Sequence, residues 1–353
     1  MQNKTPLPPY IFFGDILRQF SSWLETQHYS SYFILVDTSS SIYCLPEIQN
    51  IRPDINWHII EIPRGEQYKT ITTCSLIWDA LFKNGADRHS LLVNLGGGVI
   101  GDMGGFAAST YMRGIDFVQI PTTLLAMVDA SVGGKLAVDF KLAKNIIGLF
   151  KNPVANFIDC RWLKTLPNGE KRSGWAEILK HAIIADEAAF RKMKSIPSFH
   201  DIRWEDWVQH SVQIKYQIVQ NDPKEKGLRK GLNFGHTVGH AIETYFLEHN
   251  EPKTHGECVA IGMVCAAYIS NQTLSLPDSQ LVDIVNVIKK WYDPIIIPKQ
   301  GIPQILSLMR KDKKNRAGKP NFTLIPSIGS YVYDQYPNLD LIADSLHFYN
   351  DQI

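Results

Sequence analysis

Two histidines four residues apart, His236 and His240 in the segment HTVGH, could act on a common ligand. On a helix this spacing brings both imidazoles to one face, where they can bind a metal ion. His255 follows in HGE, at the predicted start of another helix, and glycines flanking the histidines leave room for close approach. Thr237 replaces the general-base glutamate of HExxH metalloproteases, which disfavours zinc proteolysis. The pattern favours a metal site, although two of eleven histidines can fall at this spacing by chance.

A carboxylate would complete an open three-ligand site. Glu177, on the predicted helix AEILKHAII, is the candidate in this half of the chain. The alternative is an exposed helical glutamate that pairs with Lys180 or His181. The sequence leaves both interpretations open.

Three glycines, Gly96, Gly98 and Gly101, form a GxGxxG pattern between a predicted strand and a predicted helix. Without a Cβ the backbone can approach a pyrophosphate, and free amides at the helix start point toward it. A glycine-rich turn that only packs a helix on a sheet fits equally well. Asp102 follows directly, and its carboxylate would repel a phosphate unless it turned toward a ribose hydroxyl or a loop amide.

Other polar residues also follow predicted strands. Asp37 ends the first strand and could contact a ribose or cap a helix. Thr122 and Thr123 could cap a helix or contact a ligand. The loop from Arg64 to Lys69 is typical of a solvated helix start.

A set of cations is spread along the chain, and each one alone is more typical of a solvated surface residue. Arg113, Lys135 and Lys144 differ because they lie in or just after glycine-rich, apolar loops, where together they could hold a phosphate and a carboxylate. The full set is Arg113, Lys135, Lys144, Lys180, Lys215, Arg229 and Lys313.

The elements that must position these residues change halfway along the chain. In the first half, apolar runs predict strands and one amphipathic pattern predicts a helix over Thr70–Lys83. Strand, turn and helix alternate, as in a doubly wound parallel sheet. The predicted strands are Tyr32–Val36, Trp57–Ile62, Leu91–Leu95 and Phe117–Ile120.

The second half is predicted to be mainly helical. An isolated short strand is expected at Phe322–Ile325. We place the domain boundary so that residues 1–162 form an α/β domain and residues 163–353 form a helical domain. The predicted helices are Trp204–Val219, His236–Leu247, Cys258–Ile269 and Gln280–Trp291.

Composition limits the class of protein. The 353 residues exceed one usual domain, and 36 basic against 35 acidic residues leave a charge of +1. Such balance gives no long-range field for nucleic acid or a membrane surface. With no signal peptide or long apolar stretch, we expect a cytoplasmic protein. Five scattered cysteines without a CxxC pair are expected to be reduced and mostly buried.

Taken in order, the motifs resemble those of the 3-dehydroquinate synthase family, within the sugar-phosphate cyclases. They run from GEQYKT through GGGVIGDMGGFAAS, YMRGIDFVQIPTTLLAMVDASVGGK, KNIIGLF, LKTLP and AEILK to GLRKGLNFGHTVGHAIE, HGECVAIGM and DKK. The resemblance implies a Rossmann-like amino-terminal domain that binds NAD and an all-α carboxy-terminal domain. It also implies one divalent metal, zinc first and cobalt as an alternative, and a homodimer.

The resemblance also assigns residues. The metal ligands would be Glu177, His236 and His255, which moves His240 to the substrate. The NAD contacts would be Asp37, Glu66, Lys69, Gly97, Gly98, Val99, Ile100, Gly101, Asp102, Thr122, Thr123, Lys135, Lys144, Trp162, Leu163, Lys164 and Thr165. The residues that act on the substrate would be Arg113, Asp129, Lys135, Asn145, Lys180, Lys215, Arg229, Asn233, His240 and Lys313.

The implied reaction converts 3-deoxy-D-arabino-heptulosonate 7-phosphate to 3-dehydroquinate and phosphate in the shikimate pathway. It proceeds in order through transient oxidation by NAD, phosphate elimination, reduction and an intramolecular aldol closure. The alternatives are another sugar-phosphate cyclase, a metal-dependent glycerol or alcohol dehydrogenase on the same fold, and a non-catalytic protein that kept the fold. A non-catalytic protein would have lost a ligand or a cation, and none is missing.

Four positions depart from the family pattern. Leu136 stands where threonine is common, Asp139 where asparagine is frequent, His181 where tyrosine is usual, and Pro223 where glutamate is common. None is an implied ligand. Leu136 and Asp139 are expected near the region that binds the phosphate.

Overall fold

The computed structural model describes residues 7–141, 143–310 and 319–353. These residues form two compact units. Unit 1 holds the described residues up to Pro167 together with Trp204–Tyr216, and unit 2 holds those of Asn168–Arg203 and Gln217–Ile353. The predicted boundary at residue 162 treats each domain as one continuous segment, and it stays a prediction.

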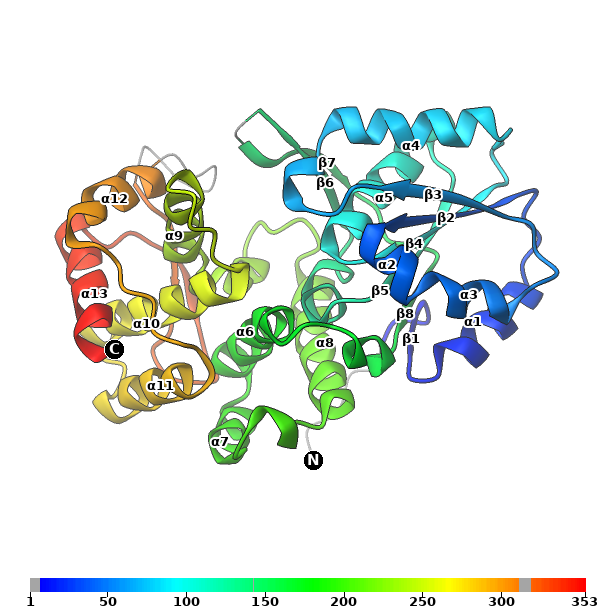
Figure 1. The fold of residues 1–353 in the computed structure, drawn as a ribbon. Helices are drawn as coiled ribbons and strands as arrows, with labels where there is room; N and C mark the ends of the chain where they lie inside the picture. Colours follow the sequence, from blue (N-terminus) through cyan, green and yellow to red (C-terminus); the bar gives the residue numbers. More distant parts are fainter. Residues whose placement is uncertain (1–6, 142, 311–318) are drawn as a thin grey trace. The chain divides into compact units, whose positions relative to one another are not determined.

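Unit 1 is built on a six-stranded sheet in the order β1-β8-β5-β4-β2-β3 (Figure 1). All of its strand pairs are parallel, with Leu35 opposite Asn94 and Leu92 opposite Phe117. Parallel strands are buried on both faces, which explains continuous apolar runs rather than alternation. The strands are β1 (Ile11–Phe13), β2 (Tyr32–Asp37), β3 (Trp57–Ile62), β4 (Leu91–Gly96), β5 (Asp116–Pro121) and β8 (Ala155–Ile158).

Helices and short turns connect these strands. The helices are α1 (Ile16–Glu25), α2 (Thr38–Tyr43), α3 (Leu45–Ile51), α4 (Ile71–Lys83), α5 (Gly98–Thr110) and the first part of α8 (Trp204–Asn221). The turns are η1 (Glu66–Tyr68), η2 (Tyr111–Arg113), the π-helical η3 (Ala126–Ala130) and η4 (Cys160–Lys164), and an antiparallel pair is formed by β6 (Lys135–Phe140) and β7 (Ala143–Phe150).

The strand order creates a switch point in the sheet. From β2 the chain passes to β3 on one side and then returns to β4 on the other side of β2. In open α/β sheets, ligands bind outside the carboxyl ends of strands at such a point. Asp37 ends β2, and Gly97 follows β4 directly. The predicted α/β amino-terminal fold is confirmed.

Unit 2 is mainly helical, as predicted. Its longest helix, α10, is buried on most sides because its residues from Cys258 to Ile269 are nearly all small or apolar. The helices are α6 (Asn168–Ala185), α7 (Glu187–Ser195), α9 (His236–Glu248), α10 (His255–Leu274), α11 (Asp278–Trp291), α12 (Ile302–Arg310) and α13 (Leu339–Gln352), with turns η5 (Phe199–Asp201), η6 (Leu228–Asn233) and η7 (Lys299–Gly301).

One prediction about unit 2 is wrong. The late strand, β9 (Phe322–Leu324), is not isolated, because it pairs antiparallel with β10 (Val332–Gln335). The sequence of β10, VYDQ, lacks an apolar run, and its four residues are only partly buried. No strand signal was therefore available from hydropathy.

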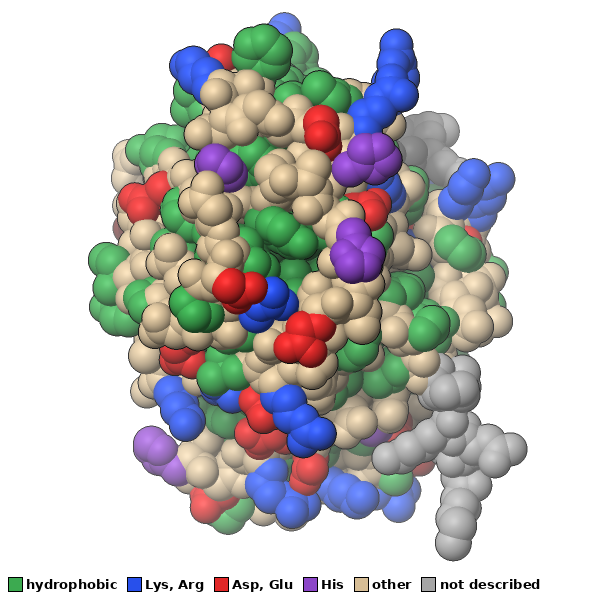
Figure 2. All heavy atoms as spheres, turned by 90° about the vertical axis from the view of Figure 1, so that its right-hand side faces the viewer, with side chains coloured by type: hydrophobic (Ala, Val, Ile, Leu, Met, Phe, Trp, Pro, Cys, Tyr) green, Lys and Arg blue, Asp and Glu red, His purple; other side chains and the backbone are tan. Residues whose placement is uncertain are grey.

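The surface agrees with the balanced composition. On the face shown in Figure 2, Lys and Arg side chains lie interspersed with Asp and Glu side chains. No helix among the described residues is long and apolar enough to cross a membrane. Four cysteines are buried, Cys160 is partly buried, and all five are free thiols, as expected.

Leu136, one of the departures from the family pattern, lies in the core of unit 1. Its side chain is 4% exposed and belongs to the same apolar cluster as Phe33, Met103 and Val138. A leucine at this position therefore contributes packing.

We expect Leu136→Thr to lower the free energy of unfolding by about 2 kcal/mol, because it removes buried carbon and buries a hydroxyl. Leu136→Val should cost about 1 kcal/mol and serves as the matched control. Urea unfolding followed by tryptophan fluorescence measures both. Equal stability of the threonine variant and the wild type would contradict the core assignment.

Candidate active site

Glu177 and Lys180 are buried charges on helix α6. Glu177 is 0% exposed and Lys180 is 1% exposed, and the two side chains form an ion pair one turn apart. A buried charge is tolerated only when it is paired, because it has lost its water. The alternative of an exposed Glu177 is wrong, whereas its pairing with Lys180 is confirmed.

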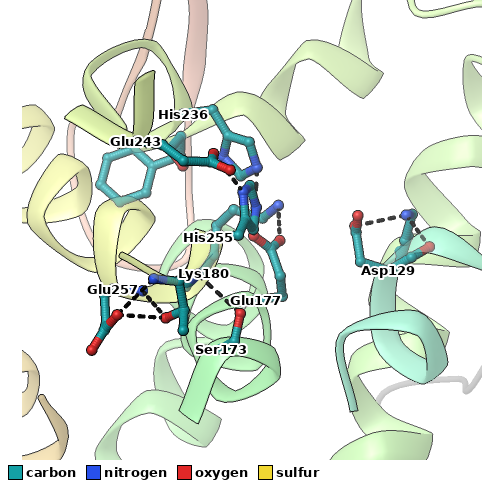
Figure 3. Close-up of polar contacts among 12 residues, drawn as sticks. Asp129, Ser173, Glu177, Lys180, His236, Glu243, His255 and Glu257 are labelled. Atoms are coloured by element: carbon teal, nitrogen blue, oxygen red, sulfur yellow. Dashed lines mark hydrogen bonds and ion pairs between the residues drawn. The ribbon is translucent and has the colours of Figure 1, made fainter. Parts of the chain in front are cut away.

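Two histidines reach the same carboxylate (Figure 3). The Oε1 atom of Glu177 lies 3.4 Å from Nε2 of His236 and 3.5 Å from Nε2 of His255. Burial would raise the pKa of Glu177, but Lys180 and the two histidines hold it well below its usual range. The carboxylate is therefore ionised and faces two imidazole nitrogens.

Close backbone approach brings these helices together. Gly235, in the left-handed conformation with φ of 78°, precedes His236 and starts α9. Gly256 follows His255 at the start of α10, and a Cβ on it would lie 2.3 Å from the carbonyl oxygen of Ser173 on α6. Only glycine fits at such a distance.

The start of α10 is fixed by its cap. The backbone N–H of Thr254 donates to the Glu257 carboxylate at 2.7 Å, and the Thr254 hydroxyl accepts the backbone N–H of Glu257 at 3.4 Å, which makes a capping box. The N–H of Gly256 donates to the Ser173 hydroxyl at 3.1 Å. These bonds fix the helix turn that carries His255.

Each imidazole is oriented through its second nitrogen. Nδ1 of His236 lies 3.1 Å from the carbonyl oxygen of Phe234, and Nδ1 of His255 lies 3.4 Å from Oε2 of Glu243. Partners of this kind orient metal-binding histidines in proteins. Burial alone would lower the pKa of His255, but Glu177 and Glu243 raise it to about 9.

His240 lies beside this pair. Its ring centroid is 5.2 Å from that of His236 and 5.7 Å from that of His255. One ring nitrogen of each of the three histidines lies within 4.8 Å of the others. One carboxylate and imidazoles form a donor set that zinc, cobalt or iron accepts.

Arg229 and Asn233 lie on η6 of unit 2. Arg229 is 2% exposed, and its Nη1 donates to the carbonyl oxygen of Pro223 at 2.7 Å. Asn233 donates to Glu225 at 2.8 Å. Because Pro223 contributes only its backbone carbonyl, its departure from the family pattern leaves this contact intact.

Asp222 organises the loop that leads to η6. Its carboxylate accepts the backbone N–H groups of Lys226, Gly227 and Arg229 at 2.9, 2.7 and 3.0 Å. Partial burial raises the pKa of Asp222, but these three bonds outweigh it and lower the pKa below the usual value.

In unit 1, the groups at the carboxyl ends of the strands have structural partners. Asp37 caps α2 by accepting the N–H groups of Ser39 and Ser40, each at 2.8 Å. The hydroxyl of Thr123 accepts the N–H of Ala126 at 3.2 Å. Helix α5 begins without a side-chain cap after Gly97, which suits an anion at its first amides.

Lys69 is a buried cation in unit 1. It is 4% exposed, and its ammonium donates to Asp102 and to the side-chain oxygen of Asn145, each at 2.6 Å. Burial would lower the pKa of Lys69, but Asp102 and Glu66 outweigh it and raise the pKa. Asp102 therefore turns toward a lysine, a partner that the sequence interpretation did not include.

Asp129 and Lys215 form a second pair in unit 1. The ammonium of Lys215, which is buried, lies 2.7 Å from Oδ1 of Asp129. Asp129 comes from η3 and Lys215 from the part of α8 that belongs to unit 1. Each of these side chains thus has a partner of opposite charge.

The remaining predicted residues differ in exposure. Arg113, Lys135, Lys144, Lys164 and Thr165 are exposed, Glu66 is exposed beside Lys69, and Thr122, Trp162 and Leu163 are buried. Gly98, Val99, Ile100 and Gly101 form the first turn of α5. Lys313 lies outside the described residues.

Comparison with known proteins identifies the family. Residues 59–173 match the model of the 3-dehydroquinate synthase N-terminal domain, and residues 174–315 match that of the C-terminal domain. A 3-dehydroquinate synthase of Parabacteroides distasonis is 39% identical over 339 residues, with 96% of each chain covered. The chain belongs to the 3-dehydroquinate synthase family. A 3-dehydroquinate synthase of Picosynechococcus sp. is 44% identical over 292 residues, which cover 81% of this chain and 80% of that one.

Solved structures agree on the fold. A 2-deoxy-scyllo-inosose synthase complexed with carbaglucose-6-phosphate, NAD⁺ and Co²⁺ is 25% identical, with a TM-score of 0.85 and 96% of each chain covered. The 2-epi-5-epi-valiolone synthase of Streptomyces hygroscopicus, with NAD⁺ and Zn²⁺ bound, is 24% identical, with a TM-score of 0.88 over 100% of this chain and 99% of that one. The family models and the curated relatives, rather than these structures, show that the chain is an enzyme, a 3-dehydroquinate synthase of the shikimate pathway.

Several supporting residues of this 3-dehydroquinate synthase were missed from the sequence. Glu243 lies seven residues after His236, a helical spacing that could have marked it as a partner. Asp222 and Glu225 precede η6 in a polar loop that carries no comparable signal. Their roles depend on contacts that only the folded chain displays.

We expect Asp222→Asn to destabilise the protein by about 1 kcal/mol at pH 7. The neutral amide has one accepting oxygen, whereas the carboxylate offers two charged oxygens to the three N–H groups. Partial exposure of the site keeps the cost small. The folded-state pKa is lowered, so the stability is present above the unfolded pKa near about 4 and is lost as the pH falls through the folded value. Calorimetric melting temperatures from pH 7 down to about pH 2 measure this, because the loss extends below the usual pKa of the carboxyl. A gap between variant and wild type that persists unchanged to about pH 2 would contradict the charge-based cap.

Proposed function

We propose that this enzyme converts 3-deoxy-D-arabino-heptulosonate 7-phosphate to 3-dehydroquinate and phosphate, with NAD recycled at each turnover and one divalent metal bound. The observation that carries the proposal is the buried Glu177 carboxylate facing the Nε2 atoms of His236 and His255. A sugar phosphate as substrate follows from the family to which the chain belongs.

The donor set supports a metal held by Glu177, His236 and His255. Three protein ligands that leave further positions open are typical of catalytic zinc sites. Neither oxygen of Glu177 has a hydrogen-bond donor other than its ionic partners among the described residues. Zinc is our first choice and cobalt the second, in line with the ions bound in the two cyclase structures.

The sheet topology supports NAD binding in unit 1. Asp37 and Gly97 follow neighbouring strands at the switch point, where dinucleotides bind in this class of sheet. The uncapped start of α5 would receive the pyrophosphate. The proposed NAD contacts are Asp37, Glu66, Lys69, Gly97, Gly98, Val99, Ile100, Gly101, Asp102, Thr122, Thr123, Lys135, Lys144, Trp162, Leu163, Lys164 and Thr165.

When bound, NAD would accept and return a hydride, and the metal would polarise substrate hydroxyls. The chain's own residues supply charge and position. Lys180 keeps Glu177 ionised, and Arg229 offers a buried guanidinium that is held in place through Pro223. Buried cations attract an anionic substrate more strongly than solvated ones because the local dielectric is low.

The residues proposed to act on the substrate are those that the family resemblance implies: Arg113, Asp129, Lys135, Asn145, Lys180, Lys215, Arg229, Asn233, His240 and Lys313. A homodimer, implied by the family resemblance, and a cytoplasmic location, expected from the sequence alone, stay predictions.

We expect the purified enzyme to release phosphate from the heptulosonate phosphate only when NAD and a divalent metal are both present. NADH should not accumulate, because each hydride returns to the substrate. Phosphate release and absorbance at the NADH band measure the two quantities. Stoichiometric NADH formation from glycerol or a simple alcohol would instead support the dehydrogenase alternative.

We expect His255→Ala to lower zinc affinity at least a hundredfold and to abolish turnover, because it removes one of three ligands. Metal content after dialysis and circular dichroism test binding and folding separately. His249→Ala, which removes a histidine just after α9 whose Nδ1 lies 2.7 Å from the backbone carbonyl oxygen of Tyr245, is the matched control. Full activity of His255→Ala without bound metal would refute the ligand assignment.

A further inference from the structure

Asp139 connects two segments of unit 1 that are far apart in the sequence. It lies near the end of β6, and its carboxylate accepts the backbone N–H of Asn145 at 2.6 Å. Its own N–H donates to the carbonyl oxygen of Lys69 at 2.7 Å, next to an isolated bridge with Thr70. One residue therefore holds the backbone of both Asn145 and Lys69.

The conformation of Asn145 is one that such a bond stabilises. Its φ is 53°, in the left-handed region, which asparagine adopts more readily than most non-glycine residues but which is still uncommon. The carboxylate of Asp139 stabilises this conformation because it accepts the backbone N–H of Asn145 in a charge-assisted hydrogen bond, which is stronger than a neutral one. The asparagine that is frequent in the family could also accept this N–H, but without the charge.

The side chains complete a closed network. Lys69 donates to the side-chain oxygen of Asn145 and to Asp102, each at 2.6 Å. The two residues whose backbones Asp139 holds are thus bonded to each other through their side chains. A shift of Asn145 out of the left-handed conformation would break its bond to the buried ammonium.

We propose that Asp139 is a positioning residue that holds Asn145 beside Lys69 and so sets how tightly the substrate binds. The inference rests on the proposed function, in which Asn145 contacts the substrate and Lys69 contacts NAD. Without Asp139, Asn145 would occupy its competent conformation for a smaller fraction of the time. The apparent affinity for the substrate would fall in proportion to the population of this conformation, whereas the enzyme–substrate complex, once formed, would be unchanged.

The predicted signature is therefore a change in KM rather than in kcat. For Asp139→Ala we expect a KM for the heptulosonate phosphate about tenfold above that of the wild type, with kcat within about threefold. Asp139→Asn keeps an oxygen that can accept the Asn145 N–H, so its KM should return to within about threefold of the wild type. Steady-state kinetics at saturating NAD and zinc measure both.

Asp87→Ala provides the matched control. The Asp87 carboxylate also accepts a backbone N–H, that of His89 at 2.7 Å, but in an exposed turn outside the candidate site. Its loss should leave KM and kcat unchanged. An unchanged KM in Asp139→Ala, or an asparagine variant as impaired as the alanine variant, would overturn the hydrogen-bond role.

Hydrogen–deuterium exchange gives a readout that does not depend on activity. In Asp139→Ala and not in Asp87→Ala, the peptide that contains Asn145 should exchange about tenfold faster than in the wild type. Unchanged exchange in Asp139→Ala would overturn the positioning role. A wild type that releases no phosphate would refute the proposed function, while the exchange experiment would still decide the role of Asp139.

Discussion

The architecture of unit 2 depends on one buried carboxylate. Glu177 has no exposure to water, and an unpaired charge there would cost several kcal/mol. Lys180 lies on the same helix, so local sequence supplies one counter-charge. The other partners, His236 and His255, come from the first residues of two further helices, α9 and α10. Gly256 lets α10 approach α6 at Ser173, and Gly235 lets the start of α9 approach α10 at Val259 and Met263.

In unit 1 a buried positive charge likewise requires partners of opposite charge or with accepting oxygens. There the buried group is the ammonium of Lys69, and Asp102 and Asn145 supply the oxygens that replace its water. Parallel strands bring the loops at their carboxyl ends to one edge of the sheet. The β6–β7 pair adds Asn145 to this edge from a segment 76 residues away. In both units, polar groups from distant segments converge because a buried charge requires them.

Much of this could be predicted from the sequence. Strand β3 matches the predicted Trp57–Ile62, since a short run rich in β-branched residues after a turn has few other interpretations. The three-residue β1 and the four-residue β8 are too short to show a period. The spacing of His236 and His240 indicated a site, because helical period links sequence directly to a shared face. No such local rule reports that Lys69, Lys180 and Arg229 are buried, since lysine and arginine are usually solvated.

Contacts across long separations explain what the sequence left out. Asp139 and Leu136 appeared only as departures from a family pattern, which did not show that Leu136 packs in the core. Neighbours along the chain thus face opposite environments, because Leu136 is buried in β6 while Asp139 reaches Asn145 across the β6–β7 pair. A family pattern identifies which positions vary. Only the contacts decide whether a variation changes packing, as at Leu136, or the geometry of the site, as at Asp139.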